Sequence, residues 1–201
     1  ARADPAERIL RAASKLLTEE GPEALTNRRV AEEAGCTTMA IYSRYGSKSG
    51  VLEALFHEGL DRIGEAQRSV AADLDPRAAV EAMCVAFRRT ALNYPGHYWL
   101  VFGPPPKDFH PSEAARQRAR RAFEVLVAVV DRAVTAGRSD GDAERIAFEL
   151  FAVSHGHTAL GLVDLVPADA TAEAMFLESI QRVLDACIGA SDQGRSTAVM
   201  P

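Results

Sequence analysis

Residues 26–52, TNRRVAEEAGCTTMAIYSRYGSKSGVL, constrain the fold of this chain more than any other stretch. Three apolar residues recur at the spacing of a short amphipathic helix: Val30, Ala31 and Ala34. Thr26 can cap the start of this helix, and Gly35 can end it, because a helix C-terminus favours a residue that tolerates the left-handed conformation. A second short helix follows at once. Two short helices joined by a tight turn form a helix-turn-helix.

The second short helix has an outward face that a protein core does not require. Thr37 or Thr38 can cap this helix, and Ile41 anchors it inward. Four other residues face away from that anchor: Met39, Ala40, Tyr42 and Ser43. Because this face is small, polar and aromatic, it suits the groove of DNA better than the interior of a protein.

The rest of the chain also has helical rather than strand periodicity. Its apolar runs are as long as helices, and they are separated by breaks at Gly21-Pro22, Asp75-Pro76, Tyr94-Pro95-Gly96, Gly137 and Pro167. The sequence therefore predicts an all-α protein of about nine helices, with an N-terminal three-helix domain that contains the helix-turn-helix and a C-terminal helical bundle.

The domain organisation follows from these breaks. These breaks divide the chain into residues 1–47, which hold the candidate DNA-binding helix-turn-helix, and residues 48–188, which form the C-terminal helical part. A helix from Lys48 to about Ala72 connects the two parts. The polar tail, residues 189–201, is expected to be disordered because it lacks apolar residues at regular spacing.

Charge is distributed unevenly along the 201 residues. The whole chain has a net charge of -5, but residues 1–50 hold eight basic and seven acidic residues, while the remainder holds 15 basic and 21 acidic residues. Basic charge is therefore kept near the candidate DNA-binding end.

Three cysteines lie far apart, which indicates neither a disulfide framework nor a zinc site. Since no long apolar run and no signal-peptide core are present, the sequence predicts a cytoplasmic protein without a membrane partner.

The pattern Gly-x-Thr-x-x-x-Ile-Tyr-x-x-Tyr-Gly-Ser-Lys-x-x-x-Leu, from Gly35 to Leu52, resembles the signature of the TetR family of bacterial repressors. The resemblance implies a homodimer whose N-terminal domains read a palindromic operator in double-stranded DNA. It also implies that the C-terminal helices, residues 48–188, dimerise and bind a ligand that releases the DNA. In the C-terminal half, Trp99 and Ser154-His155-Gly156 are similar to positions of one class in that family, the WHG domain.

The early residues of a helix in the major groove meet the base edges, so Thr38, Met39, Ala40 and Ser43 are candidate base readers. Their methyl groups suit thymine, but none of them makes a bidentate contact to guanine, which Arg28 or Arg44 could supply. Thr37, Tyr42 and Lys48 suit phosphate, and Lys48 also lies at a helix N-terminus that favours anions. Each of these residues alone could be an ordinary surface side chain, and the prediction depends on their combination.

Aromatic residues of the C-terminal half are candidate ligand contacts: Phe87, Tyr94, Trp99, Phe102, Phe123, Phe151 and His155. They would form an apolar wall with few polar groups, as in most ligand sites, or they would belong to the core. The last two helices carry enough apolar surface for an intermolecular four-helix bundle. The candidate interface residues are Ala152, Gly156, Ala159, Leu160, Val163, Phe176, Ile180, Val183 and Leu184.

No cofactor, metal ion or catalytic activity is expected. His155 and His157 are two residues apart, so a helix directs them differently and they do not form a metal pair. The chain has no nucleophile elbow, phosphate-binding glycine loop or nucleotide fingerprint. A ligand-responsive regulator of transcription is therefore the predicted function, and a helical carrier of a lipophilic molecule that does not regulate DNA is the alternative.

Overall fold

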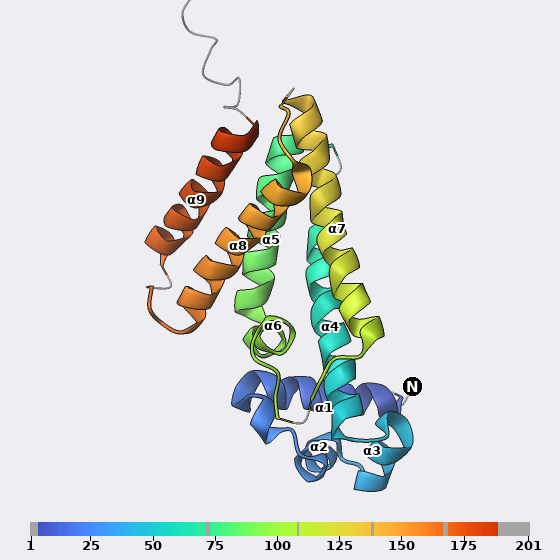
Figure 1. Ribbon diagram of the computed structural model, residues 1–201. Helices are drawn as coiled ribbons and strands as arrows, with labels where there is room; N and C mark the ends of the chain where they lie inside the picture. The colour runs from blue at the N-terminus through green and yellow to red at the C-terminus, as the bar shows by residue number, and fades with distance from the viewer. Residues whose placement is uncertain (1–3, 71–72, 108, 138, 167–168, 189–201) are drawn as a thin grey trace, which may run out of the picture. The chain divides into compact units, whose positions relative to one another are not determined.

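The computed structural model describes residues 4–70, 73–107, 109–137, 139–166 and 169–188, and every regular element in these ranges is a helix (Figure 1). The elements in order are α1 (Pro5–Glu20), the short 3-10 helix η1 (Pro22–Ala24), α2 (Asn27–Ala34), α3 (Thr38–Tyr45), α4 (Lys48–Arg68), α5 (Pro76–Asn93), α6 (Pro95–Phe102), α7 (Glu113–Ala136), α8 (Ala143–Leu162) and α9 (Ala170–Ile188). The predicted all-α fold with an N-terminal helix-turn-helix is confirmed.

Local capping explains the boundaries of the helix-turn-helix. The Thr26 hydroxyl accepts a hydrogen bond from the Arg29 amide at 3.2 Å, and Gly35 ends α2 in the left-handed conformation with φ 60°. At the start of α3, the Thr37 hydroxyl accepts from the Ala40 amide at 3.3 Å. Of the two threonines that the sequence left open, the cap of α3 is therefore Thr37.

The described residues form two compact units. The N-terminal unit lies within Ala1–Glu65 and Thr90–Ala122, and the C-terminal unit lies within Ala66–Arg89 and Phe123–Pro201. The predicted division after residue 47 does not coincide with these packing units, because the three N-terminal helices share their core with part of α4, with α6 and with the start of α7.

The N-terminal unit is held together by one apolar core. Its fully buried side chains include residues of α1, the turn after η1, α3 and α4: Ile9, Leu17, Leu25, Ile41, Leu52 and Leu55. Phe109, from the segment between α6 and α7, is 1% exposed and lies against Phe56 with ring centroids 6.5 Å apart. The segment that follows α6 therefore helps to form the core beneath the helix-turn-helix.

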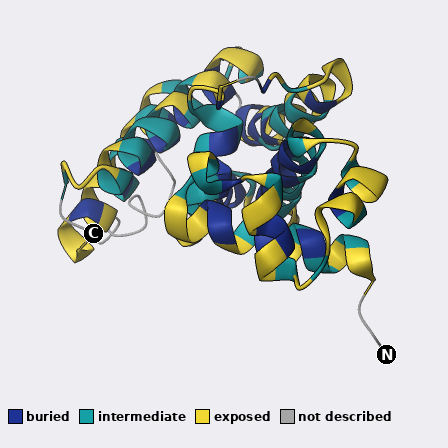
Figure 2. Cartoon of the chain, turned by 90° about the horizontal axis from the view of Figure 1, so that it is seen from below, coloured by how far each residue is buried: buried dark blue, intermediate teal, exposed yellow. Residues whose placement is uncertain are grey.

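The core of the C-terminal unit comes from α5, α7, α8 and α9. Buried residues at every fourth position of α9 pack into it: Phe176, Ile180, Leu184 and Ile188. Buried and exposed residues alternate along single helices (Figure 2), as amphipathic helices require. The connecting helix α4 ends at Arg68, about four residues before the predicted end at Ala72, which lies outside the described residues. The tail from residue 189, which was predicted to be disordered, also lies outside the described residues.

Candidate nucleic-acid interface

Helix α3 presents an exposed face that no part of its own unit covers. Met39 is 71% exposed and Tyr42 is 50% exposed, whereas Ile41 is completely buried in the N-terminal core. Thr38 and Ser43 are exposed beside them, but Ala40 is half-buried and packs against the core. Three of the four residues predicted to face outward thus form one exposed face together with Thr38, and Ala40 contributes less to it than the sequence indicated.

Two arginines near this face differ in how firmly they are held. The Arg28 side chain is largely exposed, and its Nε donates to Glu32 Oε1 at 2.9 Å within α2. Exposed ion pairs of this kind contribute little stability, so Arg28 can leave it for a nucleic acid. Arg44 is exposed in the last turn of α3. Arg29, in contrast, donates twice to the Glu20 carboxylate, at 2.5 and 2.6 Å, and ties α2 to α1.

Two of the three phosphate-binding candidates, Lys48 and Thr37, lie at helix N-termini. Lys48 is the first residue of α4 and is half-buried, while the preceding Ser47 hydroxyl accepts a hydrogen bond from the Gly50 amide at 3.2 Å. Thr37 is exposed at the N-terminus of α3. Both positions combine a polar side chain with the positive end of a helix dipole, which attracts phosphate.

A buried polar cluster that was not predicted from the sequence lies beneath the helix-turn-helix. His97 of α6 is 2% exposed, and its Nε2 lies 3.3 Å from both the Ser14 hydroxyl of α1 and Glu58 Oε2 of α4. The other oxygen of Glu58 accepts from Arg62 at 2.5 Å, and the Arg62 guanidinium lies 4.0 Å from the centre of the Tyr94 ring. These contacts join α1, α4 and α6.

The charge of Glu58 is stabilised by this cluster. Burial alone would raise the pKa of Glu58, but the hydrogen bond and charge of His97 and the Arg62 guanidinium outweigh it and hold the pKa below its ordinary value. The only sequence signal was the spacing of Glu58 and Arg62, which is typical of an ion pair on one helix. Their partner His97 lies 39 residues from Glu58 and had no such signal.

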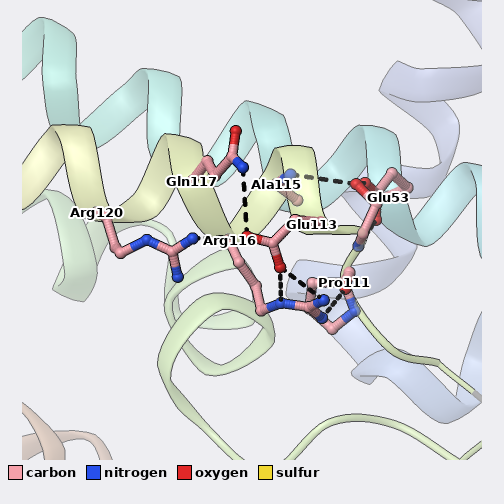
Figure 3. A network of polar contacts seen from close by, with 8 residues as sticks. Glu53, Pro111, Glu113, Ala115, Arg116, Gln117 and Arg120 are labelled. Carbon is pink, nitrogen blue, oxygen red and sulfur yellow. Dashed lines mark hydrogen bonds and ion pairs between the residues drawn. The ribbon is translucent and has the colours of Figure 1, made fainter.

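The arginines at the start of α7 belong to a structural network (Figure 3). Arg116, Gln117 and Arg120 converge on the Glu113 carboxylate with bonds of 3.1, 3.4 and 2.6 Å. Ser112, which caps α7, donates its amide to Glu53 of α4 at 3.2 Å. This network stabilises the start of α7 and ties it to α4, so these arginines are engaged with the protein itself.

The predicted ligand residues are divided between the two units. Phe87, Phe123, Phe151 and His155 belong to the C-terminal unit, and the Phe151 ring lies 5.7, 6.1 and 5.9 Å from the other three in that order. Tyr94, Trp99 and Phe102 belong to the N-terminal unit. There the Tyr98 ring lies 5.1 Å from Trp99 and 5.5 Å from Phe102. Aromatic packing accounts for these contacts in both units.

A hollow of about 500 Å³ in the C-terminal unit contains none of these aromatic residues. It lies between the end of α4 and α5 and is lined by Ala66, Ser69, Val70, Leu74, Ala78, Glu81, Ala82, Val85, Ala86 and Arg89. The lining is mainly small and apolar, with one acidic and one basic side chain. No sequence pattern indicates this hollow, because a hollow depends on how far apart two helices lie.

The predicted dimer residues divide into exposed and buried groups. Ala152, Leu160 and Val163 are exposed, and three others are half-buried: Gly156, Ala159 and Val183. Phe176, Ile180 and Leu184 are instead buried in the core of their own chain. Phe148, one helical turn before Ala152, is 61% exposed and was missed, although its spacing continues the same stripe.

Neither a metal site nor a membrane-spanning helix is found within the part of the chain that the structure describes. No group of three or more His, Cys, Asp or Glu side chains there could hold a metal ion, and no helix there is long and apolar enough to cross a membrane. Cys36, Cys84 and Cys187 are free thiols. Burial raises the pKa of the Cys84 thiol to about 11, so it stays protonated at neutral pH.

Known proteins resemble this chain in both halves. Residues 9–55 match the family model of bacterial regulatory proteins of the tetR family, and residues 80–187 match that of the tetracyclin repressor-like C-terminal domain. The tetracycline repressor protein class C of Escherichia coli is 34% identical over 88 residues, which are 44% of this chain and 40% of that protein. The HTH-type transcriptional repressor DrrR1 of Streptomyces coeruleorubidus is 36% identical over 97 residues, 47% of this chain and 33% of that protein.

The chain thus aligns with less than half the length of these curated relatives. The fold extends further, since a protein of unknown function from Rhodococcus sp. RHA1 superposes with a TM-score of 0.81 at 22% identity, covering 93% of this chain and 97% of that one. The match to the C-terminal family model spans more than half of the chain, and the N-terminal match covers the helix-turn-helix described above. The chain therefore belongs to the TetR family of bacterial regulatory proteins.

Proposed function

We propose that this chain is a transcriptional repressor that reads a palindromic operator with α3 and releases it when a small apolar or aromatic molecule binds. Regulators of the TetR family are DNA-binding transcriptional repressors and not enzymes. The observation that carries the proposal is the free face of α3, where Thr38, Met39, Tyr42 and Ser43 are exposed on a helix anchored by buried Ile41.

The contacts divide into reading and positioning groups. Met39 and the Thr38 methyl group suit the methyl group of thymine, and Ser43 suits a polar base edge. Arg28 and Arg44 are the side chains that can make a bidentate contact to guanine. Tyr42, Thr37 and Lys48 contact phosphate, which fixes the orientation of α3 without reading sequence.

A homodimer would explain a palindromic operator. Two recognition helices related by a twofold axis must lie about 34 to 36 Å apart, or a multiple of this distance, to enter major grooves on one face of DNA. The exposed apolar residues of α8 support such a pairing: Phe148, Ala152, Leu160 and Val163. A second copy of the chain would cover them and form the intermolecular bundle.

The hollow beside α5 is the proposed effector site. Its volume of about 500 Å³ is within the range of sites for small molecules, and its lining is mostly apolar. Ala66 in this lining and Lys48 belong to the same helix, α4. An effector that prefers the state not bound to DNA by about 1 to 3 kcal/mol would lower operator affinity about 5- to 150-fold.

Titration of DNA at several salt concentrations tests the DNA-binding proposal. Lys48→Ala should weaken binding to all sequences and reduce the slope of log affinity against log salt by about one, because one phosphate contact is lost. Tyr42→Ala should also weaken binding. Arg182→Ala, which removes an exposed positive charge from α9, should change neither the affinity for DNA nor the salt dependence of that affinity. A carrier that does not regulate DNA would show no difference among the wild type and these variants.

Filling the hollow tests the effector site. A panel of small apolar and aromatic molecules is screened for compounds that weaken DNA binding by the wild type. These compounds should not weaken DNA binding by Ala82→Trp, because the indole occupies the hollow. The proposed effector site is wrong if such compounds act equally on the wild type and on this variant.

A further inference from the structure

The last turn of α3 and the first turn of α4 meet with no side chain between them. A Cβ atom added to Gly50 would lie 1.8 Å from the carbonyl oxygen of Tyr45 and 2.9 Å from its carbonyl carbon. Both are backbone atoms, which cannot rotate away as the end of a flexible side chain can. Any residue other than glycine at position 50 must therefore move the start of α4 away from the end of α3.

Gly46, between these two turns, adds a second constraint. Its φ is 73°, in the region that only glycine adopts readily, although a Cβ there would meet no atom within 4 Å. The path from α3 to α4 is therefore fixed by backbone conformation at Gly46 and by close contact at Gly50.

The Tyr45 side chain links the same turn to α1. Its hydroxyl donates to the Ala6 carbonyl at 2.8 Å, and its ring is half-buried against the N-terminal core. Burial, with a smaller contribution from Asp4, raises the pKa of Tyr45, so the hydroxyl stays protonated and remains a donor. Asp4 caps this first turn of α1 by accepting from the Ala6 amide at 3.1 Å. One residue of α3 thus contacts α4 through its carbonyl group and α1 through its hydroxyl group.

We propose that Gly50 and Tyr45 are positioning residues that determine operator specificity without touching DNA. They fix the reading face of α3 relative to Lys48, the first residue of α4, and so set where the base readers lie when Lys48 holds a phosphate. The inference rests on the proposed DNA-binding function. It predicts that changes at either residue affect recognition of sequence more than attraction to the DNA backbone.

The experiment compares Gly50→Ala, Tyr45→Phe and the wild type on two DNA duplexes, one selected by the wild type from a random pool and one scrambled. Gly50→Ala should bind the selected duplex about 10- to 100-fold more weakly, the loss expected when one or two base contacts are misplaced. Tyr45→Phe, which removes one hydrogen bond, should lose about 3- to 10-fold. Binding to the scrambled duplex should change less than twofold, because it depends on phosphate contacts.

Gly161→Ala is the matched control, since it is also a glycine within a helix and nothing lies within 4 Å of its added Cβ. It should bind both duplexes as the wild type does. The inference is overturned if Gly50→Ala and Tyr45→Phe keep the wild-type ratio of selected to scrambled affinity, or if both affinities fall equally. If Gly50→Ala does not fold, as judged by its helical circular dichroism, Tyr45→Phe still decides between these outcomes.

Amide hydrogen exchange separates this inference from the proposed function. If the wild type selects no DNA sequence, the proposed function fails, and exchange in α3 then tests the positioning role alone. Amides of α3 should exchange faster in both variants than in the wild type, while those of α5 should be unchanged. Equal exchange in α3 for all three proteins would overturn the positioning role whatever the DNA result.

Discussion

Glu58 is the residue on which the buried polar cluster depends. Its two carboxylate oxygens hold His97 of α6 and Arg62 of α4, so one side chain serves two partners. A polar group in this setting is costly when it loses a partner, because the remaining groups are left without hydrogen bonds away from water. Glu58 therefore contributes to the stability of the N-terminal unit through its charge as well as its shape.

Glu58→Gln should lower the free energy of unfolding by about 1 to 3 kcal/mol at pH 7, the usual effect of losing hydrogen bonds to a charged group. The pKa of Glu58 is lowered in the folded protein, so its contribution is fully present above the unfolded value of about 4.3 and is lost as pH falls through the folded value. Urea denaturation between pH 7 and pH 3 should show a smaller acid-induced loss of stability for this variant.

Glu23→Gln provides the control for this prediction, because Glu23 is exposed on the short helix η1. Its stability should change by less than about 0.5 kcal/mol, and its pH dependence should follow the wild type. Equal pH dependence of Glu58→Gln and the wild type would contradict the role of the Glu58 charge.

At the scale of helices and segments, the segment between α6 and α7 is an anchor for the N-terminal unit. Phe109 inserts into the core that also holds Phe56, and Ser112 at the end of the segment bonds to Glu53 of α4. Leu100 of α6 and Ala115 of α7 join the same core. Because of this packing, a change in α6 or α7 acts directly on the core that supports the helix-turn-helix.

Phe109→Ala should lower the free energy of unfolding by about 3 to 5 kcal/mol, since it removes a fully buried aromatic side chain and leaves a cavity. Chemical denaturation followed by circular dichroism measures the change. Leu165→Ala removes another large apolar side chain, but Leu165 is 72% exposed, so the loss should be below about 0.5 kcal/mol. Similar losses for the two variants would contradict the anchoring role of Phe109.

Local signals made the helix-turn-helix predictable from sequence. The caps at Thr26 and Thr37 and the left-handed Gly35 depend on neighbouring residues, and the structure has all three. The His97 cluster was not predictable, because it joins residues from three helices. The predicted interface residues include both core and surface positions, because residues at every fourth position look the same in a core and in an interface. Phe176 and Ile180 are in the core, whereas Leu160 is exposed.

The proposed function requires two copies of the chain. A single recognition helix contacts only one half-site, and the second half-site adds affinity only when both helices are held at the correct spacing. The surface proposed to hold the copies together is the exposed stripe of α8 that contains Phe148 and Leu160.

Leu160→Glu should raise the dissociation constant of the homodimer about 100-fold or more, because it places an unpaired carboxylate in an apolar interface. Leu160 is 44% exposed in the single chain, so the fold should be retained. Val125→Glu is the matched control, since Val125 is similarly exposed on α7, outside the proposed surface. Sedimentation equilibrium measures the dissociation constant of the homodimer for both variants. An unchanged dimer in Leu160→Glu, or a wild type that is monomeric, would contradict the proposed interface.

The claim that α3 reads DNA is tested by selecting bound duplexes from a random pool. The wild type should enrich an inverted repeat whose half-site centres lie about 10 to 10.5 base pairs apart, or a multiple of this spacing. Enrichment should depend on the exposed face of α3, so replacing both Met39 and Ser43 by Ala should change the enriched bases within each half-site and leave their spacing unchanged. Failure of the wild type to enrich any sequence above the starting pool would contradict the claim.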